Sequence, residues 1–93
     1  MAKLTTAAIQ VAYTGTAGRT AQLTNGFNYL VTATTDCYIL QGGSGVTATT
    51  GNGLFLPKGM GVEIQVSNSA EGYVSAIQFS ANGTLTCMRL DGC

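Results

Sequence analysis

Apolar and polar residues alternate along short segments of this chain, and each segment ends at a Gly, Asn, Asp or Ser turn signal. Alternation with a period of two is typical of a β-strand with one buried face. The clearest case is residues 62–67, where Val62, Ile64 and Val66 alternate with polar residues. Strands are also predicted over residues 6–14, 19–23, 27–33, 37–41, 54–56, 73–80 and 84–90, with an extended stretch over 46–50.

The connections between these segments carry specific turn residues. Asn25-Gly26 and Asn82-Gly83 predict tight turns, because Asn and Gly tolerate the positive φ that such turns require. Asn82-Gly83 is expected to join the last two strands as a hairpin. Lys58-Gly59, which follows Pro57, predicts a type II turn.

The strand spacing predicts an all-β fold. No segment shows helical spacing over two turns with a cap, and residues that favour helices are scarce. About eight short strands favour a single small antiparallel β-sandwich that is jelly-roll-like, with a small five- or six-stranded β-barrel as the alternative. The whole chain, 1–93, is predicted to be one domain with an extended N-terminal arm over 1–8 and a short tail over 91–93.

Composition suggests a surface that neighbours cover. Hydrophobic residues make up 45% of the 93 residues and charged residues only 9%, with a formal net charge of zero. An ordinary soluble domain carries about 25% charged residues, and a net charge near zero promotes association. The alternative is a monomer with a surface of Thr, Ser, Asn, Gln and Gly.

The few charges also limit the partners. Lys3, Arg19, Lys58 and Arg89 are scattered, whereas nucleic-acid binding relies on clustered basic residues. No apolar run approaches the roughly 20 residues of a membrane span, and the N-terminal residues do not resemble a signal peptide. We therefore expect no nucleic acid and no membrane partner, and synthesis in the cytoplasm.

The residues offer no catalytic set. The chain has no His, which removes the commonest general base and the usual zinc and iron ligands. The carboxylates Asp36, Glu63, Glu71 and Asp91 lie on separate turns or strand faces, so no facing pair is predicted. We expect no enzyme activity, no metal and no cofactor. The tyrosines are expected to pack in the core or at its rim: Tyr13, Tyr29, Tyr38 and Tyr73.

The three cysteines are the reactive residues to weigh. An odd number of thiols is a reason to suspect an intermolecular disulfide, and Cys93, Cys87 and Cys37 are the candidates. Such a bond could form only outside a reducing cytoplasm. Alternatively, Cys37 and Cys87 are small buried apolar residues and Cys93 is a free thiol.

The polar, weakly patterned start of the chain is a candidate contact arm. An extended arm can add a strand to the sheet edge of a neighbour. Its residues are Ala2, Lys3, Leu4, Thr5 and Thr6. The alternative is a frayed terminus.

Several segments resemble small virion proteins of tailed bacteriophages. They are residues 36–39 (DCYI), 45–49 (GVTAT), 53–59 (GLFLPKG), 74–78 (VSAIQ) and 83–86 (GTLT). The resemblance spans about two-thirds of the chain, from Phe27 to Leu90, and consists of turn-and-strand patterns without a catalytic signature.

The resemblance implies a capsid decoration, or cement, protein. Such proteins sit on the capsid surface of the virion as trimers or dimers and bridge neighbouring subunits. The expected partners are then the major capsid protein and copies of the chain itself, as a trimer or alternatively a dimer. Two other roles stay open: a neck, tail or fibre-associated virion component, and a non-catalytic β-sandwich that binds a carbohydrate or another ligand.

Overall fold

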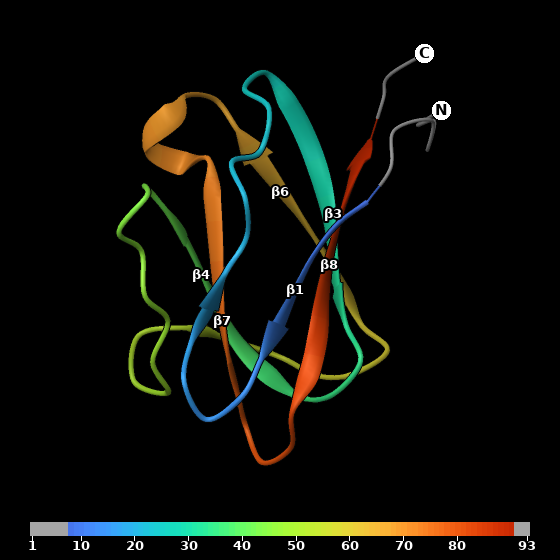
Figure 1. The fold of residues 1–93 in the computed structure, drawn as a ribbon. Helices are drawn as coiled ribbons and strands as arrows, with labels where there is room; N and C mark the ends of the chain where they lie inside the picture. The colour runs from blue at the N-terminus through green and yellow to red at the C-terminus, as the bar shows by residue number, and fades with distance from the viewer. Residues whose placement is uncertain (1–7, 91–93) are drawn as a thin grey trace.

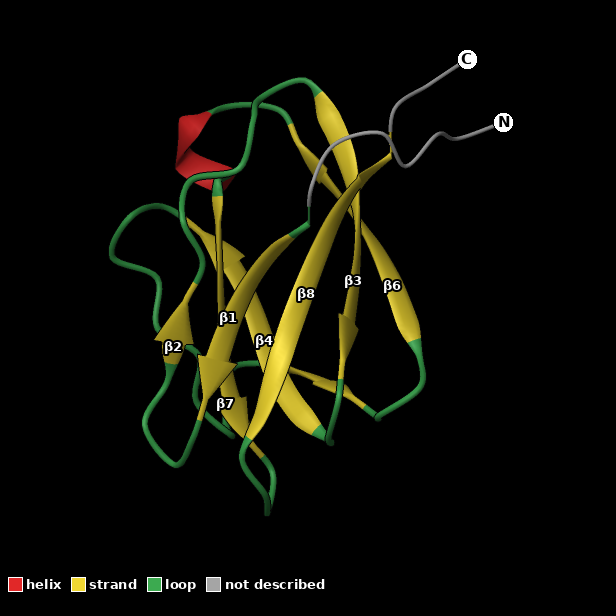
Figure 2. Ribbon diagram, turned by 45° about the vertical axis from the view of Figure 1, so that its right-hand side comes forward, coloured by secondary structure: helices red, strands yellow, loops and turns green. Residues whose placement is uncertain are grey.

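The computed structural model describes residues 8–90 and contains two four-stranded antiparallel sheets packed face to face (Figures 1 and 2). One short 3₁₀ helix, η1 (Ser69–Glu71), precedes the seventh strand. The strands are β1 (Ile9–Tyr13), β2 (Gly18–Arg19), β3 (Phe27–Ala33), β4 (Cys37–Gly42), β5 (Leu54–Leu56), β6 (Gly61–Val66), β7 (Tyr73–Gln78) and β8 (Gly83–Leu90).

The strand order is that of a jelly roll. The first sheet has the order β1-β8-β3-β6 and the second sheet the order β2-β7-β4-β5. Consecutive strands therefore alternate between the sheets, apart from β4 and β5, which are neighbours in the second sheet. This arrangement confirms the predicted β-sandwich and rules out the barrel alternative.

The core lies between the inner faces of the two sheets. Period-two alternation points every second side chain of a strand inward, so each sheet contributes a row of apolar residues. The first sheet supplies Tyr29, Val31, Val66, Leu85 and Cys87. The second sheet supplies Cys37, Ile39, Leu56, Val74 and Ala76.

The prediction of a hairpin at Asn82-Gly83 is wrong. β7 pairs with β2 and β4, whereas β8 pairs with β1 and β3, so this connection crosses from one sheet to the other (Figure 1). Gly83 is required there for space, because a Cβ would collide with the Tyr13 hydroxyl and Thr35 Oγ1. The Asn25-Gly26 turn is confirmed by the positive φ of Gly26, 87°.

Two predicted extended segments differ from the structure. Of the predicted strand 19–23 only Arg19 belongs to a strand, as part of β2. The chain nevertheless continues beside β7, because the Thr20 amide donates to the Val74 carbonyl oxygen (2.9 Å). Residues 46–50 form no strand. They belong to the loop 43–53 between β4 and β5, which folds onto the second sheet and donates the Ala48 amide to Ser75 Oγ (2.8 Å).

The sandwich is closed along one side and open along the other. β1 and β2 contact each other, and a Cβ on Gly18 would strike the Ala12 carbonyl oxygen. The opposite side is formed by β5 and β6, which are the remaining edge strands of the two sheets. The two long sides of the molecule therefore offer different surfaces to a partner.

Candidate interaction surface

Three aromatic rings gather on the outer face of the second sheet. Tyr38 lies with its ring centroid 5.5 Å from that of Phe55 and 6.1 Å from that of Phe79, and the two Phe centroids are 5.5 Å apart. We call these three residues the aromatic cluster. Phe55 is 42% exposed and Phe79 is 55% exposed, so these two rings face solvent although they contact each other and Tyr38.

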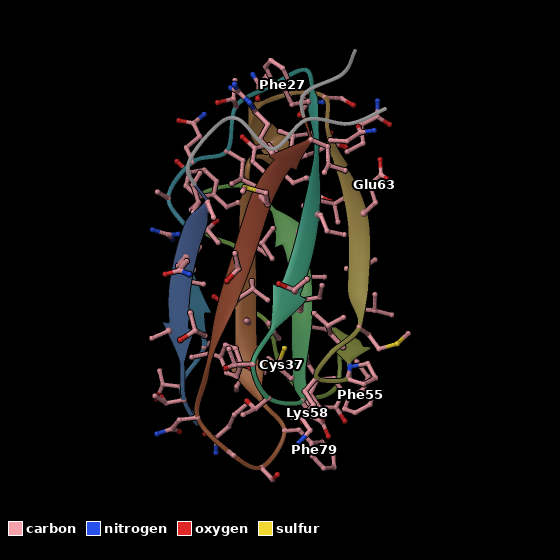
Figure 3. All side chains as sticks on the ribbon, turned by 90° about the vertical axis from the view of Figure 1, so that its right-hand side faces the viewer. Phe27, Cys37, Phe55, Lys58, Glu63 and Phe79 are labelled. Atoms are coloured by element: carbon pink, nitrogen blue, oxygen red, sulfur yellow. The ribbon has the colours of Figure 1, made fainter. Side chains whose placement is uncertain are left out.

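Strand register explains why the rings meet. Tyr38 in β4 is the direct antiparallel partner of Phe55 in β5, so both side chains leave the same face of the sheet. Phe79 follows β7 directly, and its amide donates to the Asp36 carbonyl oxygen (3.1 Å) at the start of β4. Figure 3 shows Phe55 and Phe79 at the same end of the molecule, near Lys58.

Asp36 also fixes the turn beside the aromatic cluster. Its Oδ1 accepts the Lys58 amide (2.8 Å), and the Met60 amide donates to the Pro57 carbonyl oxygen (3.2 Å). Gly59 has a φ of 79°, which confirms the predicted type II turn. Lys58 is therefore held close to the cluster.

Two further large apolar side chains are exposed near this end of the second sheet. Leu54 in β5 is 58% exposed, and Met60 in the turn before β6 is 57% exposed. Phe55 and Phe79 alone expose apolar area on the order of 200 Å², if a large side chain has roughly 200 Å² of surface. Exposed apolar side chains that lie together can mark interaction sites.

The rest of this outer face is covered. Loop 43–53 lies over Ser75, which is only 1% exposed, through the buried Ala48 hydrogen bond. Arg19 stacks over the Tyr73 ring at 5.3 Å and also donates to the Ser44 carbonyl oxygen. Solvent therefore reaches apolar side chains mainly at the end occupied by the aromatic cluster.

A second apolar surface lies along the open side of the sandwich. A groove of about 400 Å³ runs between β5 and β6 and is lined mainly by Ile39, Leu40, Leu54, Val62 and Ile64. Leu54 is the register partner of the inward-facing Ile39, so it turns into the groove while the neighbouring Phe55 turns outward. The groove and the aromatic cluster thus lie on opposite faces of β5.

The described cysteines lie in the core. Cys37 and Cys87 are free thiols with no exposed surface, which agrees with the alternative that they are small buried residues. Burial raises the pKa of the Cys37 thiol, and it raises the pKa of the Cys87 thiol to about 12. A disulfide from either residue to a neighbouring subunit would require the core to open, so their burial argues against these two candidates. Cys93 lies outside the described residues.

The remaining polar candidates have structural partners. Glu63 accepts a hydrogen bond from Asn28 Nδ2 (2.8 Å), and Glu71 accepts one from the Ser67 amide (2.9 Å). Within residues 8–90, no group of three or more Cys, Asp or Glu side chains could hold a metal ion. Asp91 and the arm residues Ala2, Lys3, Leu4, Thr5 and Thr6 lie outside the described residues.

The four tyrosines divide between the core and the outer face. Tyr13 and Tyr29 are buried, and the Tyr29 hydroxyl accepts the Thr24 amide (3.0 Å). Tyr38 and Tyr73 lie on the outer face of the second sheet. The prediction of core or rim packing did not anticipate that Tyr38 forms the base of an exposed aromatic cluster. The sequence feature that could have indicated the cluster is the presence of Phe55 and Phe79 in two strand segments that are apolar on both faces.

Comparison with solved structures supports the fold. The solution NMR structure of a de novo designed double-stranded β-helix aligns with a TM-score of 0.60 at 13% identity, covering 92% of this chain and 100% of the designed one. At that identity the likeness concerns the fold alone. No family model matches the chain, and no curated protein matches it significantly. Over the described residues, no helix is long and apolar enough to cross a membrane.

Proposed function

We propose that the chain is a structural virion protein that decorates a phage capsid and stabilises it by bridging capsid subunits. The aromatic cluster carries this proposal. Exposed aromatic side chains held in a fixed arrangement are the usual anchors of protein interfaces, where a few such residues dominate the binding energy. On this proposal the aromatic cluster docks on the major capsid protein, and Lys58 lies at the polar rim.

Three further features support this role. A jelly roll is one of the folds used by viral capsid domains, although this is an argument by analogy because folds host many functions. The charge is zero overall, so no electrostatic repulsion opposes dense packing of many copies. The resemblance of residues 27–90 to small tailed-phage virion proteins points to the same class.

Copy number in purified virions tests the proposal. Quantitative mass spectrometry should find the chain in hundreds of copies per particle if it decorates the shell. About a dozen copies would indicate a neck or tail component instead, and absence from particles would refute a virion role altogether.

Reconstitution tests the aromatic cluster. Particles that lack the chain should take up the wild-type protein but not the Phe55→Ser/Phe79→Ser double variant. Tyr73→Ser is a matched control, because Tyr73 is an aromatic residue near the opposite end of the same sheet, where it contacts Arg19. Equal uptake of the double variant and the control would show that the aromatic cluster is not the docking surface.

A ligand-binding module is the second candidate, and the groove between β5 and β6 favours it. Its volume of about 400 Å³ falls within the range of small-molecule pockets. Glycan-array and thermal-shift screening of the purified chain would detect such a ligand. A carbohydrate is expected to stack on aromatic rings, which the groove lining lacks.

A further inference from the structure

The edge of β6 that faces away from β3 is free to pair with an added strand, apart from the Gln65 carbonyl oxygen, which already accepts a hydrogen bond from a side chain of the other sheet. β6 ends the order of the first sheet and pairs only with β3. The Val66 carbonyl oxygen accepts the Gly26 amide (2.7 Å), whereas the Gln65 carbonyl oxygen accepts Gln41 Nε2 (2.9 Å) from the other sheet. Backbone groups of successive residues point to opposite sides of an antiparallel strand, so those of Glu63 face the free edge together with those of Gln65.

The groove along this edge fits the side chains of such a strand. Val62 and Ile64 of β6 face Ile39 and Leu54 across the groove, and all four are apolar. A strand added at β6 would hydrogen-bond through its backbone and place every second side chain over this apolar lining. Figure 3 shows β6 at the right-hand edge of the molecule, with Glu63 projecting from it.

We propose that the strand added at β6 is β6 of a second copy, so that the chain forms a two-fold symmetric dimer with a continuous eight-stranded sheet. β6 itself carries apolar side chains at alternate positions along the groove, Val62 and Ile64. A two-fold axis joins the two grooves, because both copies keep their inner faces on the same side of the extended sheet.

Charge selects one register for this pairing. Directly opposite residues of antiparallel strands share a face. Glu63 and Ile64 are the two central residues of β6, so the two registers that pair most of the strand place one or the other on the two-fold axis. With Glu63 on the axis, two carboxylates oppose each other, which is destabilising. With Ile64 on the axis, Glu63 of each copy lies opposite the neutral Gln65 of the other. A charged side chain on an edge strand ordinarily discourages pairing with another strand. Here the Glu63 carboxylate disfavours only the register that places it on the axis.

The other edge of the same sheet is a poorer candidate. β1 is backed by β2, which approaches so closely at Gly18 that no Cβ fits against the Ala12 carbonyl oxygen. On that side β1 and β2 lie in contact, which leaves little room for the side chains of an added strand. The dimer proposed at β6 leaves the aromatic cluster exposed, and it does not depend on a virion role.

Sedimentation of the full chain over about 1 μM to 1 mM tests the dimer. The wild type should show a concentration-dependent monomer–dimer equilibrium. Glu63→Pro should be monomeric, because proline removes a backbone donor at the free edge and is tolerated on edge strands. Circular dichroism and thermal melting would establish that this variant is folded.

Charge variants of Gln65 provide an independent test that does not perturb the backbone. Gln65→Lys places a cation opposite Glu63 twice per dimer and should tighten the dimer dissociation constant between about twofold and thirtyfold. Gln65→Glu should weaken it by a similar factor. The matched controls are Gln10→Lys and Gln10→Glu on the exposed edge strand β1, which should leave the constant unchanged.

Each alternative outcome overturns the proposal. A wild type that stays monomeric throughout the concentration range has no self-pairing edge. If Glu63→Pro still forms the dimer and the charge variants of Gln65 leave the dissociation constant unchanged, the dimer uses another surface, such as the aromatic cluster. A dimer that Gln10 variants alter as much as Gln65 variants do is not formed through β6.

Discussion

The Tyr13 hydroxyl ties the end of β1 to the connection between β3 and β4 by donating to the Thr35 carbonyl oxygen (2.8 Å) and accepting the Thr35 amide (3.2 Å). Tyr13 is 1% exposed and belongs to the first sheet, whereas the chain at Thr35 is crossing to the second. One hydroxyl thus satisfies two backbone groups at a crossing point between the sheets.

Tyr13→Phe should lower the free energy of unfolding by about 1–3 kcal/mol, because it leaves two backbone groups without this partner while keeping the ring in the core. Urea denaturation measures the loss. Tyr73→Phe serves as the control, since its ring keeps the contact with Arg19. Equal stability of both variants would show that the Tyr13 hydroxyl contributes nothing.

Asp36 is predicted to preorganise the surface around the aromatic cluster. Asp36→Ala removes the carboxylate that accepts the Lys58 amide and should lower stability by about 1 kcal/mol, with faster hydrogen exchange at Lys58. Asp36→Asn keeps an acceptor oxygen and should retain most of the wild-type protection. If Asp36→Ala leaves the exchange at Lys58 unchanged, the turn is held by its own backbone.

Hydrophobic alternation predicted the individual strands better than their partners. Residues 62–67 and 27–33 have one apolar face each, and both form strands where expected. Pairing depends on contacts distant in sequence, which a local pattern does not contain. Asn82-Gly83 has the chemistry of a hairpin, yet it connects two sheets, because its flanking strands are paired to others.

The candidate surface was harder to predict for a related reason. In residues 73–80 both alternating sets are apolar, so the pattern could not show that Val74 and Ala76 face the core while Ile77 lies on the outer row beside Tyr38. Loop 43–53 covers one end of that outer face, whereas at the other end the side chains of the aromatic cluster are exposed. Only the folded structure distinguishes the two ends.

Ser75 is predicted to hold loop 43–53 against the second sheet. Ser75→Ala would leave the Ala48 amide buried without its acceptor and should lower the free energy of unfolding by about 1–3 kcal/mol. The Ala48 amide should also exchange faster with solvent. Ser80→Ala, at an exposed site beyond β7, is the control and should change neither quantity.

The buried Cys87 thiol should make stability fall at alkaline pH. Burial raises the pKa of Cys87 from its ordinary value of 9.0 to about 12, so the unfolded chain loses this proton at a lower pH than the folded one. Its contribution to stability is complete below pH 9.0 and should decline between pH 9.0 and about 12, by on the order of 1 kcal/mol per pH unit.

Tyrosine and lysine also titrate there, so the informative quantity is the difference in pH dependence between wild type and Cys87→Ala, measured by urea denaturation at each pH. Parallel curves for the two proteins would mean that the Cys87 thiol ionises as readily in the folded chain as in the unfolded one. Labelling by a thiol reagent at pH 8 gives a second readout, because Cys87 should react only as fast as the core opens.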